Sequence, residues 1–209
     1  MKTIMRKTRP ATILLLAFVF CFFGVCCGTG LSQEIKPTVT ASADNSAKPF
    51  VVCYSRTGKA RMVATALKNQ LGCEMGEIVS HSKKGVFTIM LDQLFNRDDC
   101  QDPLSTNLKA YNPIVIVTPV WFMRLSSPAR TFMKTADLKG KDVYIFTTSG
   151  GPLPEGRKKA FKEFASEQGL NVQGVIGLQI GEKTQADFDK EVQEIVGKIP
   201  LKQGSAKQQ

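Results

Sequence analysis

The sequence predicts an α/β domain built on a doubly wound parallel sheet with helices on both faces. Short apolar runs rich in β-branched and aromatic residues recur past residue 50, and segments with apolar residues at helical spacing separate them. Strands that alternate with helices in this way pair as a parallel sheet whose faces the helices cover. One of these runs, Ile114–Thr118, is β-branched throughout, which is typical of a strand buried on both faces.

The first predicted strand, Phe50–Tyr54, runs directly into the short loop Ser55–Gly58 and then into a helix. The apolar residues of that helix share one face: Met62, Val63, Ala66, Leu67 and Leu71. The N–H groups of a first helical turn lack intrahelical partners, and the helix dipole adds partial positive charge there. With the hydroxyls of Ser55 and Thr57 nearby, this corner predicts a phosphate pocket. Its glycine spacing matches neither the dinucleotide-binding fingerprint nor the P-loop.

The remaining elements follow in order along the chain. Glu74–Val79 is a weaker strand candidate, since few of its residues are strongly apolar, and Val86–Phe95 has a helical pattern. The polar segment Arg97–Asn112 predicts a loop. Further strands are predicted at Ile114–Thr118, Val143–Thr148 and Val172–Ile180, and helices at Ser126–Met133, Pro154–Glu167 and Thr184–Ile199. Ser126 or Ser127 is the expected cap of the first of these helices.

The first 30 residues predict an export signal or a membrane anchor. Four basic residues lie before residue 10 and no charged residue follows until Glu34, while Ala11–Cys27 is almost entirely apolar. Cys26 and Cys27 suggest lipidation, although the usual leucine three positions earlier is absent, and the small residues near Gly28–Gly30 suit ordinary cleavage. Cleavage, lipidation and retention as an anchor therefore stay open. The domain is expected outside the cytoplasm, in the periplasm or on the extracytoplasmic face of a membrane.

The other boundaries follow from composition. Residues 31–49 are rich in Ser, Thr, Ala, Lys and Pro and predict a flexible tether. Residues 50–200 predict the folded domain, which is long enough to bury a hydrophobic core. Pro200 ends its last helix, and residues 201–209 predict a tail.

Three short segments follow predicted strands and so share the carboxyl-terminal edge of the sheet: Ser55–Ala60, Thr118–Phe122 and Thr147–Gly151. Two further motifs precede strands, Tyr111–Ile114 and Leu138–Lys141. In this order and spacing, the motifs resemble the flavodoxin-like family over most of the chain past residue 50. The resemblance implies a five-stranded sheet of order 2-1-3-4-5 that binds FMN at its topological switch point.

The resemblance also implies which residues hold the cofactor. The segment that matches the FMN phosphate loop comprises Ser55, Arg56, Thr57, Gly58, Lys59 and Ala60. The segment beside the isoalloxazine ring comprises Pro119, Val120, Trp121 and Phe122, and the third flavin-contacting loop comprises Thr148, Ser149, Gly150 and Gly151. An indole suits a flat flavin, and the N–H groups of a glycine-rich loop can reach its polar atoms. Ala60 departs from the family, which commonly has a second hydroxyl there; the charges of Lys59 and Arg61 either compensate or belong to a solvated helix face.

The implied function is electron transfer through bound FMN by an exported or membrane-tethered protein, with an unidentified redox partner or small acceptor. The alternatives are an FMN-dependent NAD(P)H:quinone-type reductase and a flavodoxin-fold domain that has lost FMN and acts as a binding module. Of the 28 Lys and Arg residues, 24 remain without the four before residue 10, against 18 Asp and Glu; this balance of +6 favours anionic partners or a membrane surface. Its basic residues are not interleaved with aromatic ones, so nucleic acid is not an expected partner.

The other chemistry-bearing residues predict neither a catalytic acid or base nor a metal site. His81 is the only histidine, so no triad and no histidine metal cluster can be assembled. Cys53 lies within a strand and is expected to act as a small hydrophobe. Cys73 and Cys100 lack a C-x-x-C neighbour, which disfavours a redox dithiol and leaves a disulfide between them open. The carboxylates before the third strand are expected in solvated turns: Asp98, Asp99 and Asp102.

Overall fold

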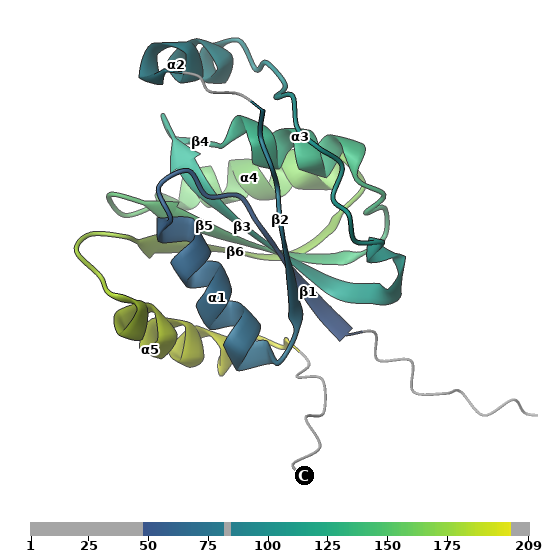
Figure 1. Cartoon of the computed structure of the whole chain (residues 1–209), viewed down its shortest axis with the longest axis vertical. Helices are drawn as coiled ribbons and strands as arrows, with labels where there is room; N and C mark the ends of the chain where they lie inside the picture. The colour runs from purple at the N-terminus through teal and green to yellow at the C-terminus, as the bar shows by residue number, and fades with distance from the viewer. Residues whose placement is uncertain (1–47, 82–84, 202–209) are drawn as a thin grey trace, which may run out of the picture. The chain divides into compact units, whose positions relative to one another are not determined.

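In the computed structural model, which describes residues 48–81 and 85–201, strands and helices alternate along the chain as the sequence predicts (Figure 1). The predicted signal or anchor lies outside the described residues, as do most of the tether and of the tail. Lys48 and Pro49, at the end of the predicted tether, already belong to the first strand. Within the described residues, no helix is long and apolar enough to cross a membrane.

Five parallel strands form the main sheet: β1 (Lys48–Cys53), β2 (Glu74–Glu77), β3 (Tyr111–Trp121), β5 (Asp142–Ser149) and β6 (Asn171–Gln179). Their order is β2-β1-β3-β5-β6, which confirms the order 2-1-3-4-5 expected for five strands. The register places apolar residues side by side across the centre, with Ile116 between Val52 and Ile145. Since all five strands run the same way, the carboxyl ends of β1, β3 and β5 are neighbours.

Helices cover both faces of this sheet (Figure 1). One face carries α1 (Lys59–Leu71) and α5 (Gln185–Val196), and the other carries α3 (Ser127–Thr135) and α4 (Glu155–Glu167). Successive residues of a strand point to opposite faces, so Val51 packs under α1 while Val52 belongs to the other core. Each large apolar side chain buried in this way stabilises the fold by about 1.5–3 kcal/mol.

β3 is longer at both ends than the predicted strand Ile114–Thr118. The predicted end of the strand at Thr118 is wrong, because Pro119–Trp121 also lie in it. Pairing explains the extension: Pro119 lies beside Thr148 of β5, and the next two residues pair with the antiparallel strand β4 (Arg124–Leu125). A strand of two residues has no detectable period, so the sequence does not predict β4.

The elements between β1 and β3 also differ in detail from the prediction. β2 is shorter than the predicted Glu74–Val79; Ile78 leaves the strand but stays buried, and its N–H donates to the Cys53 carbonyl at 2.8 Å. α2 (Val86–Leu94) occupies nearly all of the predicted helix. Figure 1 shows α2 beyond the ends of the strands rather than on a face of the sheet.

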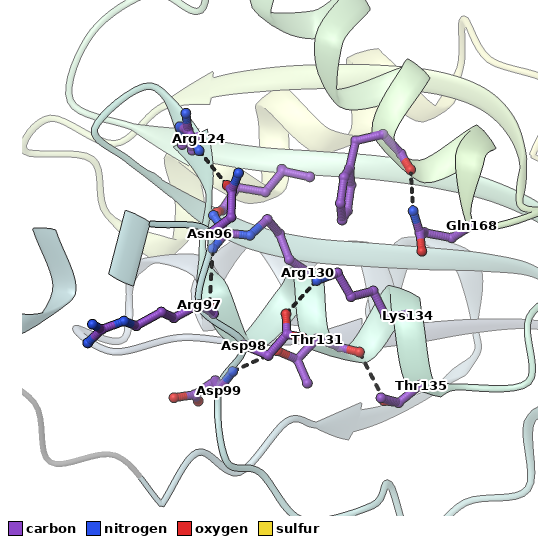
Figure 2. Close-up of polar contacts among 12 residues, drawn as sticks. Asn96, Arg97, Asp98, Asp99, Arg124, Arg130, Thr131, Lys134, Thr135 and Gln168 are labelled. Atoms are coloured by element: carbon purple, nitrogen blue, oxygen red, sulfur yellow. Dashed lines mark hydrogen bonds and ion pairs between the residues drawn. The ribbon is translucent and has the colours of Figure 1, made fainter. Parts of the chain in front are cut away.

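Polar contacts hold the segment after α2 on helix α3 (Figure 2). The Asp99 N–H donates to Thr131 Oγ1 at 2.8 Å, and Lys134 Nζ donates to Asp98 Oδ1 at 2.6 Å. Asp99 is buried, so the predicted solvated turn is wrong for that residue. The loop continues into the 3₁₀ turn η1 (Leu108–Ala110), which packs its leucine in the core.

Candidate functional site

The carboxyl ends of β1, β3 and β5 border a cavity of about 590 Å³. Every residue predicted for the cofactor site lines this cavity except Gly58 and Gly151. The lining residues among them are Ser55, Arg56, Thr57, Lys59, Ala60, Pro119, Val120, Trp121, Phe122, Thr148, Ser149 and Gly150. These segments are far apart in sequence, and the strand order brings them together at one edge of the sheet.

The first segment forms a corner at the start of α1 whose groups suit an anion. Gly58 is the N-cap residue with φ of 86°, a conformation that L side chains rarely adopt. α1 has no acidic residue in its first turn, so nothing on the helix opposes the positive end of its dipole. Ser55 Oγ is buried without a hydrogen-bond partner. A buried polar group left unpaired costs about 1–3 kcal/mol, and an anion bound at this corner would satisfy the hydroxyl.

Two basic residues of α1 have partners outside this corner. Lys59 Nζ donates to a backbone carbonyl of the loop before α5 at 3.0 Å. Arg61 makes a bidentate pair with Glu77 at 2.6 and 2.8 Å, and the hydrogen bond to that carboxylate raises the pKa of Arg61. Both cations are thus engaged elsewhere, while Ala60, which has no hydroxyl to offer, is buried in the apolar core. Arg56, exposed on the loop itself, lines the cavity.

Trp121 forms a wall of the cavity at the end of β3. Its indole packs edge-on against Tyr54, with ring centroids 5.7 Å apart and ring planes at 81°. Earlier on the same strand, Thr118 Oγ1 is hydrogen-bonded to Ser126 Oγ at 2.7 Å, and the Ser126 N–H donates to the Pro119 carbonyl at 3.2 Å. Ser126 is the N-cap residue of α3, as predicted, but its side chain makes no capping bond because it braces the end of β3 instead.

The third segment completes the rim on the side of β5. Thr148 is buried, and Ser149 Oγ donates to the Gly151 carbonyl at 2.6 Å, which fixes the turn. A Cβ added at Gly150 or Gly151 would meet nothing within 4 Å. The backbone there is consequently open to the approach of a flat ligand.

The cavity has two lining residues that the sequence does not predict, Ile89 and Ile180. Ile180 directly follows β6, so its place at this edge could have been deduced from the strand order. Ile89 reaches the cavity because α2 lies beyond the strand ends, a position that helical periodicity does not reveal.

A second cavity of about 400 Å³ adjoins the first. The two share four lining residues: Ser55, Arg56, Ile89 and Trp121. Its other walls include charged and hydroxyl groups, among them the paired Arg61 and Glu77, with Ser80, Asp99 and Ser127. This chamber extends the site toward β2 and α3.

The remaining candidate residues do not join this site. His81 Nε2 lies 2.6 Å from Asp102 Oδ1, and both side chains are exposed. Cys73 and Cys100 are free thiols. Burial raises the pKa of Cys53 to about 12 and that of Cys73 to about 11, so both favour the protonated form at neutral pH. In the described part of the chain, no three His, Cys, Asp or Glu residues are grouped so that they could hold a metal ion.

We compared the sequence and the fold with those of known proteins. No protein-family model matches the chain, and no curated protein matches its sequence significantly. Among solved structures, a protein assigned as a flavoprotein from Bacteroides eggerthii is similar at a TM-score of 0.61 and 22% identity, over 74% of this chain and 99% of the other. One from Bacteroides uniformis gives a TM-score of 0.62 at 18% identity, over 73% and 99%. A flavoprotein in complex with FMN from Lactobacillus acidophilus gives a TM-score of 0.54 at 24% identity, over 63% of this chain and 93% of the other.

These similarities establish a shared fold at low sequence identity. Together with the strand order β2-β1-β3-β5-β6, they show that the chain has a flavodoxin-like α/β fold. The cavity described above lies at the carboxyl-terminal edge of that fold, where the strand order reverses.

Proposed function

We propose that this flavodoxin-like chain binds FMN in the cavity at the ends of β1, β3 and β5 and transfers electrons through it. The observation that supports this most directly is the convergence of three predicted segments on one cavity of about 590 Å³. The proposal also draws on the Lactobacillus acidophilus flavoprotein, which has the same fold and is in complex with FMN.

The residues at the start of α1 fit the phosphate of FMN. Ser55 Oγ is buried and lacks a partner, and Gly58 opens the first helical turn without a side chain in the way. The N–H groups of that turn point their partial positive charge at the corner, which suits a phosphate dianion. Arg56 adds a full positive charge beside the same cavity.

The other two segments fit the flavin ring. Trp121 provides an aromatic wall, and Gly150 with Gly151 provides open backbone on the side of β5. Aromatic pairs of this kind contribute about 0.5–1.5 kcal/mol beyond the area they bury. The bound cofactor would supply the electron chemistry, while these residues would orient it and shield it from water.

We further propose that the domain works outside the cytoplasm, exported or tethered to a membrane. The basic residues before residue 10 and the apolar segment Ala11–Cys27 support this proposal. A reporter enzyme fused after Gln209 is expected to be active only outside the cytoplasm. Activity of a reporter that works only in the cytoplasm would refute the export proposal.

A reductase that takes hydride from NAD(P)H is the second candidate, and the adjoining cavity favours it. That cavity, of about 400 Å³, shares Trp121 and Arg56 with the proposed flavin site and offers room for a second molecule. Stopped-flow mixing of the FMN-loaded protein with NADPH and NADH under nitrogen separates the two functions. In an electron carrier, the flavin absorption bleaches slowly or not at all after mixing. Bleaching of the flavin within seconds would establish the reductase.

Titration of the cofactor-free chain with FMN tests the binding proposal itself. We expect flavin fluorescence to be quenched to a defined end point, and riboflavin, which lacks the phosphate, to bind more weakly. Fluorescence that stays unquenched in excess protein would leave the chain as a flavodoxin-fold binding module without FMN.

A further inference from the structure

Helix α2 buries Ile89 together with two polar residues, Asp92 and Gln93, and exposes most of its other apolar side chains. Asp92 and Gln93 are 2% and 1% exposed, while Phe87 and Leu94 are 69% and 64% exposed. Arg130 explains the polar side, because its guanidinium donates to Gln93 Oε1. In an ordinary surface helix the apolar stripe faces the core and the polar stripe faces water. The orientation of α2 instead leaves most of its apolar side chains uncovered.

A tight turn beside α2 adds two more apolar side chains. Phe122 and Met123 join β3 to β4 with φ of 49° and 61°, the left-handed conformation that normally selects asparagine or glycine in such turns. Both side chains are exposed. Two apolar residues in a strained and solvated turn cost stability, which is typical of a functional surface.

The two elements lie next to each other and form one surface. Arg124, after the turn, donates to Asn96, after α2, and Asn96 and Met123 line the same groove. Phe122 and Ile89 of α2 likewise line one cavity. We call this surface the apolar platform; its residues are Phe87, Met90, Leu94, Phe95, Phe122 and Met123, which are 37 to 69% exposed.

The charges around the apolar platform are basic. Arg97 is exposed, and its guanidinium lies 5.5 Å from the centroid of the Phe95 ring. Arg124 lies at the base of the turn. The carboxylates nearby are withdrawn from the surface or paired: Asp92 is buried, and Asp98 is bonded to Lys134 at 2.6 Å.

We propose that the apolar platform docks onto the surface of an anionic lipid bilayer. Phenyl and methionine side chains of this kind insert at the boundary between headgroups and acyl chains, and arginines at their edge reach anionic headgroups. The same charges disfavour a second copy of this chain, because a symmetric contact between two platforms would bring arginines of both copies together.

The chain outside the described residues is long enough for this contact. The apolar segment Ala11–Cys27 is predicted to place the chain at a membrane, and about 20 residues separate it from β1. Fully extended, they span up to about 70 Å. β1 starts at the amino-terminal edge of the sheet, and α2 of the apolar platform lies beyond the other edge. A link of this length allows the edge that carries the apolar platform to face the bilayer.

Trp121 provides a reporter for the full chain, because it is the only tryptophan and it directly precedes Phe122. The cofactor-free protein is reconstituted into vesicles of phosphatidylglycerol or phosphatidylcholine, with or without brominated acyl chains, which quench tryptophan at short range. Docking predicts quenching of Trp121 by brominated phosphatidylglycerol and much less by brominated phosphatidylcholine. Insertion of the amino-terminal segment alone leaves this signal unchanged, since that segment contains no tryptophan.

Three variants test the named residues. Phe87→Ser and Phe95→Ser each remove an inserted ring and are expected to shift the docking equilibrium about tenfold toward the undocked state. Arg97→Gln is expected to shift it about fivefold on phosphatidylglycerol, and to change little on phosphatidylcholine. Lys190→Gln, on α5, removes the same charge far from α2 and is the matched control (Figure 1). Circular dichroism establishes that each variant is folded.

Several results would overturn the proposal. One is equal Trp121 fluorescence on brominated and unbrominated phosphatidylglycerol while the chain remains on the vesicles. Another is equal quenching of Trp121 by the two brominated lipids. A third is an equal change in quenching in Arg97→Gln and Lys190→Gln. Protection of Trp121 from lipid and from aqueous quencher in a dimeric chain would instead assign the apolar platform to a second copy. Because the experiment omits FMN, none of these results depends on the cofactor.

Discussion

Replacement of Arg130 by methionine should destabilise the fold strongly, because this guanidinium holds α2 and its following loop on α3. Arg130 is buried, and it donates to Gln93 Oε1, to the Leu125 carbonyl at 3.1 Å and to the Arg97 carbonyl at 3.3 Å. A hydrogen bond to a charged group contributes about 1.5–3 kcal/mol, so the two shorter bonds, to Gln93 and Leu125, together contribute roughly 3–6 kcal/mol. Burial of the guanidinium lowers the pKa of Arg130 and reflects a desolvation cost that offsets part of this gain.

The expected net loss for Arg130→Met is therefore about 3 kcal/mol in the free energy of unfolding, measured by urea denaturation. Lys134→Met, one turn further along α3, is the matched control: it removes only the ion pair with Asp98 and should cost less than about 1 kcal/mol. Hydrogen exchange in Arg130→Met should accelerate most in α2. A loss below about 1 kcal/mol, or exchange that rises evenly along the chain, would refute this role of Arg130.

Three further predictions concern single side chains. Arg56→Gln should weaken FMN binding about tenfold and riboflavin binding much less, because the charge acts on the phosphate; an equal effect on both ligands in a fluorescence titration would contradict this. Trp121→Ala should weaken both ligands about fivefold through lost ring contact, and unchanged affinities would place the flavin elsewhere. Because burial raises the pKa of Cys53 to about 12, its stabilising contribution is complete below pH 9, the ordinary thiol value, and is lost as pH rises toward 12. Wild type should therefore lose up to about 1.4 kcal/mol per pH unit more than Cys53→Ala in urea titrations above pH 9, and parallel pH profiles would contradict it.

The sequence predicts the sheet well because its strands are buried on both faces. Unbroken apolar runs such as Ile114–Thr118 are hard to mistake, and the spacing between them leaves room for one helix each. Once the strand order is known, the loops after β1, β3 and β5 must lie together. For that reason, nearly all residues predicted for the cofactor site do line one cavity.

The features that the sequence misses depend on pairing partners, most of them distant in the chain. The end of β3 is a strand only because β4 and β5 pair with it. Asp99 is buried because its N–H reaches Thr131 of α3. The periodicity of α2 predicts the helix but not which side faces inward: Ile89 and Gln93 are buried while Met90 and Leu94 are exposed, and Arg130 bonds Gln93 from α3. Local pattern gives the elements, and these long-range polar contacts set their orientation.

The sequence also does not predict the side-chain partners of the two basic residues at the start of α1. Lys59 and Arg61 stand at positions where their charge could serve a phosphate. In the structure, one donates to a carbonyl of the loop before α5 and the other pairs with Glu77 of β2. Both partners lie on other elements, so neither pairing has a sequence signature.

Binding of FMN by the cofactor-free full chain tests the central proposal most directly. Purified protein mixed with FMN and passed through a desalting column should retain one flavin per chain, with visible absorption and quenched fluorescence. Riboflavin under the same conditions should be lost, since we propose that the corner at Ser55 and Gly58 holds the phosphate that riboflavin lacks. Protein that emerges colourless after incubation with excess FMN, while circular dichroism shows it folded, would contradict the account.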